Sequence, residues 1–234
     1  HLNRQLLSVL FNIDKICVGF FADYLTIFID LMLIKLYTVN SQGKGCEMMS
    51  IVVIYKTKYG ATQQYAEWIA DALGADCFNI RKFNKEQFAQ YDTVILGGGI
   101  YAGNINGISL ISKNFAQLVD KHLIIFTVGI KDPGQPRNAE EIEKGLLKVL
   151  TPDMLEHIKV FSFRGALDCD KVNVLHYSML KILAQVTDDL TTPDVDEGRI
   201  FQEAFEKPQN FIEYDQIKPL VNYVKTMAYI KEQR

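Results

Sequence analysis

Three hydroxyl side chains and a glycine follow the first strongly apolar segment after residue 48, and their spacing suits anion binding. Residues 51–55 are an uninterrupted apolar run, which indicates a buried strand. The polar set comes directly after it and consists of Thr57, Tyr59, Gly60 and Thr62. Apolar residues then recur at helical spacing, so a helix must begin at this loop. The unpaired N–H groups and the dipole of a helix N-terminus, with hydroxyl donors beside them, suit a phosphate group.

This loop does not match two common phosphate-binding motifs of α/β proteins. It lacks the glycine-rich dinucleotide fingerprint, and no Gly-Lys-Ser or Gly-Lys-Thr follows Gly60. What remains is a loop rich in hydroxyl groups. The alternative interpretation is an ordinary strand-to-helix turn in which the threonines only cap the helix.

Four further segments read as strands, and helical segments lie between them. The predicted strands are residues 75–80, 93–96, 122–128 and 158–163. The predicted helices are residues 61–73, 108–119, 139–150, 172–186 and 215–230, with a brief helical turn over residues 84–91 and a mostly polar loop with a short helix over residues 188–207. Apolar strands alternating with helices predict a parallel sheet covered on both faces, in a doubly wound α/β topology.

Two more loops are expected at the same edge of this sheet. The strand over residues 93–96 runs into the glycine cluster of residues 97–103, where the backbone must approach something closely or adopt positive φ. The alternative there is a flexible turn. The strand over residues 122–128 ends at a loop over residues 129–134. In doubly wound sheets, ligands bind outside the carboxyl ends of the strands, where the strand order reverses.

The sequence Thr57-Lys58-Tyr59-Gly60-Ala61-Thr62 resembles the phosphate loop of flavodoxins, Thr-x-Thr-Gly-x-Thr, with Tyr59 at the middle threonine. The resemblance extends from about Met49 through the C-terminal helix. Within the flavodoxin-like proteins it is closest to the quinone-linked protoporphyrinogen dehydrogenases. It implies a five-stranded parallel sheet in the order 2-1-3-4-5, with an extra helical insertion near the C-terminus that begins after Phe163.

The resemblance also implies FMN as the cofactor, with the phosphate at the first loop and the isoalloxazine ring at the other two. The implied cofactor-binding residues are Thr57, Lys58, Tyr59, Gly60, Ala61, Thr62, Gly98, Gly99, Ile100, Tyr101, Ala102, Gly103, Val128, Gly129, Ile130 and Lys131. Tyr101 is the candidate for stacking on the flavin. The alternative is that its ring folds back onto the core.

The implied activity is that of an FMN-dependent oxidoreductase. It would pass electrons from a small organic donor, with protoporphyrinogen IX as the candidate, to a quinone. A flavodoxin-like electron carrier with a protein redox partner is the alternative, and a scaffold that kept the fold without the cofactor is a third. The insertion after Phe163 favours the enzyme, because an electron carrier needs no additional apolar helix beside the flavin. Flavin supplies the redox chemistry itself, so no side chain is assigned a catalytic role.

Composition excludes several classes of protein. The chain has 234 residues, 48% of them hydrophobic, and a net charge of −3 without a clustered basic patch, which argues against a nucleic-acid surface. The four cysteines are far apart and show no pairing with each other or with histidines. They predict neither a metal site nor a disulfide framework, and a reducing cytoplasm is the expected setting. His122, His157 and His176 stand singly and are interpreted as structural.

Residues 1–47 differ from the rest of the chain in composition. They contain an apolar stretch, but Asp23, Asp30 and Lys35 interrupt it, and a membrane-spanning helix needs about 20 predominantly apolar residues. The preferred interpretation is translated upstream sequence, with the true start at Met48 or Met49 and a flavodoxin-like domain over residues 48–234. A weak anchor is the alternative, so any membrane association is expected to be peripheral, at the inner face.

Overall fold

A computed structural model describes residues 49–172, 174–188 and 195–232. The predicted upstream extension, residues 1–47, lies outside the described residues. Within the described ranges, no helix is both long enough and apolar enough to cross a membrane.

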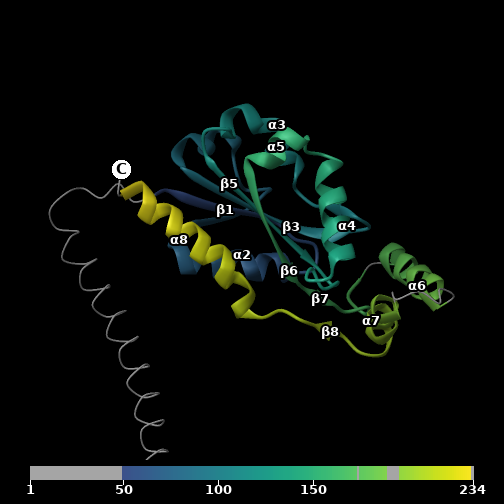
Figure 1. Cartoon of the computed structure of the whole chain (residues 1–234). Helices are drawn as coiled ribbons and strands as arrows, with labels where there is room; N and C mark the ends of the chain where they lie inside the picture. The colour runs from purple at the N-terminus through teal and green to yellow at the C-terminus, as the bar shows by residue number, and fades with distance from the viewer. Residues whose placement is uncertain (1–48, 173, 189–194, 233–234) are drawn as a thin grey trace, which may run out of the picture. The chain divides into compact units, whose positions relative to one another are not determined.

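A parallel sheet lies at the centre of the described part of the chain (Figure 1). Its parallel strands are β1 (Ile51–Lys56), β2 (Asp76–Asn79), β3 (Thr93–Tyr101), β5 (His122–Gly129) and β6 (Ile158–Arg164). They lie in the order β2-β1-β3-β5-β6, which is the predicted order 2-1-3-4-5. The short strand β4 (Asn104–Ile105) pairs antiparallel with β3 and is an addition that the sequence did not predict. The doubly wound α/β fold is confirmed.

Helices cover both faces of the sheet (Figure 1). One face carries α2 (Ala61–Leu73) and α8 (Lys218–Glu232), and the other carries α3 (Ser109–Leu118), α4 (Pro136–Leu147) and α5 (Pro152–Glu156). Neighbouring residues of one strand enter opposite cores: Val53 packs with α2 and α8, whereas Ile54 packs on the other side. This two-sided burial explains why the strands read as continuous apolar runs. Each fully buried aliphatic side chain contributes roughly 1.5–3 kcal/mol to folding.

The extra helical insertion predicted after Phe163 is present. It consists of β7 (Ala166–Leu167), α6 (Val174–Asp188), α7 (Val195–Glu206) and β8 (Gln209–Asn210), and β7 pairs antiparallel with β8. Its helices share a small apolar core of Cys169, Leu180, Phe201 and Ala204. The polar stretch 188–207 was predicted to be mostly loop, whereas α7 makes 12 residues of it helical because Phe201 and Ala204 give it an apolar side.

Other element boundaries shift slightly from the predicted ones. The brief turn over residues 84–91 is a 3₁₀ helix, η1 (Lys85–Gln90), which Asn84 and Gln87 close as a capping box. The closing helix begins with a second 3₁₀ turn, η2 (Tyr214–Ile217), that leads directly into α8. Neither shift moves an element to another layer of the fold.

The prediction that the second strong strand ends at residue 96 is wrong, because β3 continues through the glycine cluster to Tyr101. The backbone of the glycine cluster does approach other atoms closely, as predicted, but these atoms belong to the protein. A Cβ on Gly97 would lie 2.1 Å from the ring of Phe126, and one on Gly98 would lie 2.4 Å from the carbonyl oxygen of Asn106. Positive φ occurs later, at Ala102 (48°) and Gly103 (66°), where the chain turns into β4.

We expect Gly97→Ala to lower the free energy of unfolding by roughly 1–3 kcal/mol or more, because its methyl group overlaps the Phe126 ring. Phe126→Leu removes the obstructing ring atoms, so Gly97→Ala should cost less in that background. Urea denaturation of the wild type, the two single variants and the double variant measures the coupling, expected at about 0.5–3 kcal/mol. Strictly additive effects would contradict the packing account.

Candidate functional site

The ends of four parallel strands meet at one edge of the sheet. The register pairs Lys56 of β1 with Gly98, Gly99 of β3 with Val128, and Gly129 of β5 with Arg164 of β6. Because the strands are parallel, the loops that follow them leave from the same edge. The three loops predicted from the sequence therefore lie side by side.

A cavity of about 510 Å³ opens at this edge, within the size range of small-molecule sites. The predicted site residues that line it are Tyr59, Ala61, Thr62, Ile100, Tyr101, Ala102, Gly103, Val128, Gly129, Ile130 and Lys131. The predicted site residues outside its lining are Thr57, Lys58, Gly60, Gly98 and Gly99. Gly98 instead makes room for the backbone at Asn106, as its close approach shows.

The loop between β1 and α2 is shaped by a glycine turn. Gly60 precedes the first residue of α2 with a φ of 99°, and its N–H donates to Oγ1 of Thr57 over 2.9 Å. No side chain of the described residues caps α2, so Thr57 holds the turn and does not cap the helix, contrary to the alternative interpretation. Thr62 is only 2% exposed and lines the cavity. The first-turn N–H groups of a helix lack intrahelical partners, which leaves this end of the cavity rich in donors.

Tyr101 at the end of β3 faces the cavity and does not fold back into the core. Its ring lies close over the backbone of Gly99, where a Cβ would come within 2.8 Å of the ring. Burial raises the pKa of Tyr101 to about 12, so the phenol is neutral at physiological pH. The ring of Tyr59 meets it edge-on at a centroid distance of 5.9 Å. This part of the cavity offers aromatic surface to a flat ligand.

His176 of α6 is a site residue that the sequence analysis missed. Its ring lies 5.9 Å from that of Tyr101 with planes 21° apart, and its nitrogens contact the side chains of Lys58 and Tyr59. It was interpreted as structural because it stands singly on a predicted helix, with no acidic or cysteine neighbour at the spacing of a metal site or a catalytic dyad. No local signal marks it, since its partners are more than 70 positions away in the sequence.

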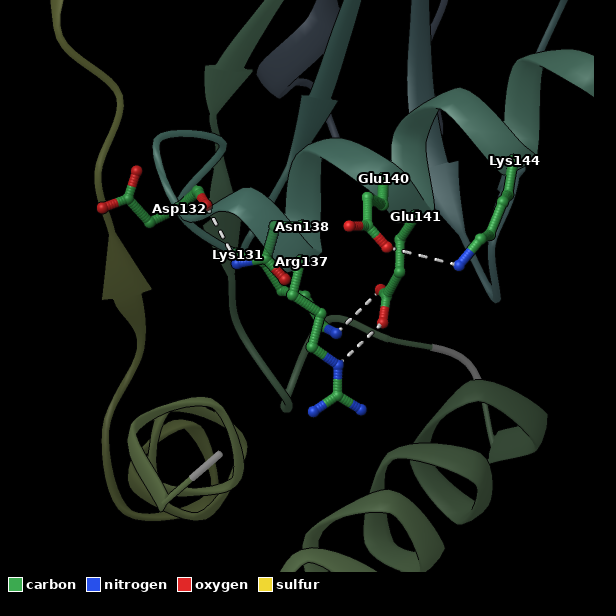
Figure 2. Close-up of polar contacts among 7 residues, drawn as sticks. All are labelled: Lys131, Asp132, Arg137, Asn138, Glu140, Glu141 and Lys144. Carbon is green, nitrogen blue, oxygen red and sulfur yellow. Dashed lines mark hydrogen bonds and ion pairs between the residues drawn. The ribbon is translucent and has the colours of Figure 1, made fainter. Parts of the chain in front are cut away.

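The loop between β5 and α4 and the first turns of α4 bring charged side chains to the cavity. Figure 2 shows the polar contacts among them. Glu141 lies between two cations, with 2.9 Å to Nζ of Lys131 and 3.9 Å to Nε of Arg137. Nδ2 of Asn138 donates to the carbonyl oxygen of Asp132 over 2.9 Å. Asn138 is 3% exposed, and its Oδ1 accepts no hydrogen bond from any described residue. A buried acceptor at the cavity is suited to a ligand N–H or O–H group.

The insertion supplies the remaining wall of the cavity. Apolar side chains of this wall come from the segment before α6, from α6 itself and from α7: Val172, Met179, Leu180 and Phe201. Ile130 of the β5–α4 loop packs against the same small core. Near the sheet, the N–H of Gly165 donates to the carbonyl oxygen of Gly129 over 2.6 Å, which fixes the start of the insertion to the site. The cavity thus has a donor-rich end, an aromatic wall and an apolar cover.

The thiols of the described cysteines are not activated. Cys77 and Cys169 are free. Burial raises the pKa of Cys77 to about 11, and burial with the nearby Asp168 and Asp170 also raises the pKa of Cys169. Both groups are protonated at neutral pH and are poor nucleophiles.

The fold and the position of the cavity define a protein of the flavodoxin-like class. The family model described as "Flavodoxin domain" matches residues 52–194, which is more than half of the chain. The chain therefore belongs to the flavodoxin family. No protein of curated function is similar enough in sequence to match it.

Three of the solved structures that are similar to this chain have the following sequence identities, coverages and TM-scores. The Trp repressor binding protein from Bacillus subtilis is 17% identical, with 50% of this chain and 83% of that chain covered and a TM-score of 0.36. A flavoprotein from Lactobacillus acidophilus in complex with FMN is 11% identical, with coverages of 50% and 92% and a TM-score of 0.33. A flavodoxin mutant from Fusobacterium nucleatum bound to flavin mononucleotide is 18% identical, with coverages of 55% and 75% and a TM-score of 0.30.

We expect His176 to titrate below its ordinary pKa of 6.5, because burial and then the charge of Lys58 disfavour the imidazolium. The unfolded chain binds this proton more readily, so the contribution to stability is lost as the pH falls below 6.5. Lys58→Met should raise the pKa of His176 while leaving it below 6.5, since the effect of burial remains.

An NMR titration of the His176 Cε1–H resonance between about pH 4 and 8 measures this pKa. Lys181→Met is the matched control, because Lys181 is an exposed lysine on the same helix. It should leave the titration unchanged. A pKa at or above 6.5 in the unmodified chain would contradict the described environment.

Proposed function

We propose that this protein is an FMN-dependent oxidoreductase that passes electrons from a small organic donor to a quinone. FMN, when bound, supplies the electron transfer itself. The chain's own residues bind and orient the reactants and exclude water from them. One observation favours an enzyme over an electron carrier, and it is the cavity that the insertion covers. Residues of the insertion line this cavity together with the three loops: Val172, Met179, Leu180 and Phe201.

The residues of the cavity fit FMN in three respects. The N-terminus of α2 and the hydroxyl of Thr62 suit the phosphate. The ring of Tyr101, with Ile100 beside it, suits a flat heterocycle. The Oδ1 of Asn138, which accepts no hydrogen bond within the described part of the chain, suits a ring N–H group. Membership in the flavodoxin family supports the same cofactor.

The insertion supports a substrate of its own beside the cofactor. An electron carrier has to present its flavin to a protein, whereas α6 and α7 place apolar side chains over this cavity. Such a cover excludes water and suits a flat, largely apolar donor or a quinone ring. The resemblance to protoporphyrinogen dehydrogenases makes protoporphyrinogen IX the first donor to test.

A flavodoxin-like electron carrier is the second candidate, and one observation favours it. Large apolar side chains of α6 face solvent, with Val174 83% exposed, Ile182 60% and Tyr177 40%. Exposed apolar residues of this size occur at surfaces that bind proteins or membranes. The same residues could bring the enzyme to a membrane that holds its quinone.

Anaerobic reduction of the FMN-loaded protein separates the two candidates. The enzyme should be reduced by protoporphyrinogen IX, or by another small donor, and reoxidised by a menaquinone analogue. If small donors leave the flavin oxidised and a flavodoxin reductase reduces it rapidly, the protein is an electron carrier. Protein that neither copurifies with FMN nor quenches its fluorescence would contradict both candidates.

We expect Thr62→Val to weaken FMN binding at least about tenfold, because a hydrogen bond to a charged group contributes roughly 1.5–3 kcal/mol. Thr62 is the sharper choice in this loop, since the hydroxyl of Thr57 already accepts from Gly60. Isothermal titration with FMN measures the effect. Thr226→Val is the control, because the Thr226 hydroxyl donates to a carbonyl of α8 and should not affect affinity. An unchanged affinity in Thr62→Val would place the phosphate elsewhere.

Tyr101→Ala should change the bound flavin more than the fold. Loss of the ring should shift the visible absorbance of the flavin and its reduction potential, while the far-UV circular dichroism stays the same. Tyr101→Phe keeps the aromatic face and should preserve both flavin properties. Unchanged spectra in Tyr101→Ala, together with a lower melting temperature, would show that the ring serves packing alone.

A further inference from the structure

The loop between β1 and α2 is contacted by a residue 118 positions further along the chain. His176 lies in the first turn of α6, and its Nδ1 is 2.6 Å from the hydroxyl oxygen of Tyr59. Its Nε2 is 2.8 Å from Nζ of Lys58. On its other side the ring lies beside that of Tyr101. The insertion thus brings an imidazole to the loop that the sequence marks for an anion.

These contacts are those of a neutral imidazole. The Lys58 ammonium group has donors only, and its Nζ lies 2.8 Å from Nε2 and 3.3 Å from Nδ1 of the ring. Nδ1 also shares a hydrogen bond of 2.6 Å with the Tyr59 hydroxyl, and the tautomer of the ring sets which of the two is the donor. Burial and the Lys58 charge both lower the pKa of His176, in agreement with a neutral ring. The charged or titratable groups that these contacts place on the ring are Lys58, Tyr59 and Tyr101.

A phosphate monoester bound beside His176 would favour the protonated form of its imidazole. It carries about −1.5 to −2 charges near neutral pH, and a nearby anion favours the protonated form of an imidazole. Lys58 and a protonated His176 repel each other when they stand alone, but both are attracted to a shared anion. Hydrogen bonds between cationic donors and phosphate oxygens are stronger than those between neutral groups. The contact between the Lys58 ammonium group and the neutral imidazole can therefore give way to two contacts with phosphate.

We propose that His176 is a ligand of the FMN phosphate, supplied by the insertion and not by the loop between β1 and α2. The proposal rests on the proposed binding of FMN and adds a binding residue to that site. Tyr59 fits this arrangement, because the residue that replaces the middle threonine of the loop is itself bonded to His176. α6 then both covers the cavity and binds the cofactor.

Comparing FMN with riboflavin tests the role of the phosphate directly, because riboflavin has the same ring system without that group. His176→Phe keeps a flat ring beside Tyr101 but removes both nitrogens. We expect the dissociation constant for FMN to rise about tenfold or more and that for riboflavin to change less than about twofold. His157→Phe is the matched control, since His157 contacts Phe115 and the carbonyl of Asp153 outside the cavity.

Three outcomes would overturn the proposal. Equal losses for FMN and riboflavin would assign His176 to the ring or to the packing of α6. A gain in FMN affinity would mean that the imidazole occupies space that the flavin needs. Unchanged affinities would remove His176 from the site. If the wild type binds neither flavin, the proposed function fails as well, so the two failures are distinguishable.

A second measurement uses the unmodified protein and does not depend on the folding of a variant. The pKa of His176, followed by the NMR signal of its Cε1–H, should rise when FMN binds and should not rise when riboflavin binds. A rise with both flavins would indicate a change in burial. No rise with FMN would contradict a contact between the imidazole and the phosphate.

Discussion

The parallel register of β3 with its two neighbours is the constraint on which the site depends. It places the ends of β1, β3 and β5 level, so that the loops after them share one edge. This register requires residues without side chains where the strands pack tightly. Gly97 lies against the ring of Phe126, and Gly98 lies against the backbone that leads out of β4. A side chain at either position would displace a core ring or the β3–β4 hairpin, and with it Tyr101. The glycine cluster therefore shapes the site indirectly, because it lets β3 pack closely against the residues around it.

The insertion depends on that edge and completes it. The N–H of Gly165 donates to Gly129 of β5, and the Tyr65 hydroxyl donates to the carbonyl oxygen of Arg164 over 2.7 Å. These two bonds fix the start of the insertion to the sheet and to α2. β8 returns beside β7, so both ends of the helical pair are held at the site. As a result α6 lies where its first turn can reach the loop after β1, and its next turns line the cavity with Met179 and Leu180. The loops after the strands and the insertion that covers the cavity are thus held together as one site.

The sequence predicts the strands, the doubly wound topology and the three loops well, because these depend on local apolar runs and on the handedness of crossovers. The strand order was predicted from the resemblance to flavodoxins. It fails where tertiary packing decides. The glycine cluster reads as a loop, but Gly97 and Gly98 pair with both β1 and β5, and Gly99 pairs with β5. The last two residues of β3 then pair with β4, so residues 97–101 stay in the strand. α7 reads as polar, but its own Phe201 and Ala204 are buried against Leu180 of α6 and give the helix an apolar side. His176 and Asn138 carry no local signal at all. His176 becomes a site residue through partners that no spacing rule connects to it, and Asn138 through its burial at the cavity.

A titration of isotopically labelled protein with FMN, followed by two-dimensional ¹H–¹⁵N NMR, tests the central claim that this edge of the sheet holds the cofactor. The account predicts that the largest shifts fall on the amides of residues 58–63, 100–103 and 129–131, with saturation at one FMN per chain. Amides of α8 and β2, which lie away from the cavity lining, should stay unchanged. Shifts concentrated on α8, or no saturable shifts anywhere, would contradict the account.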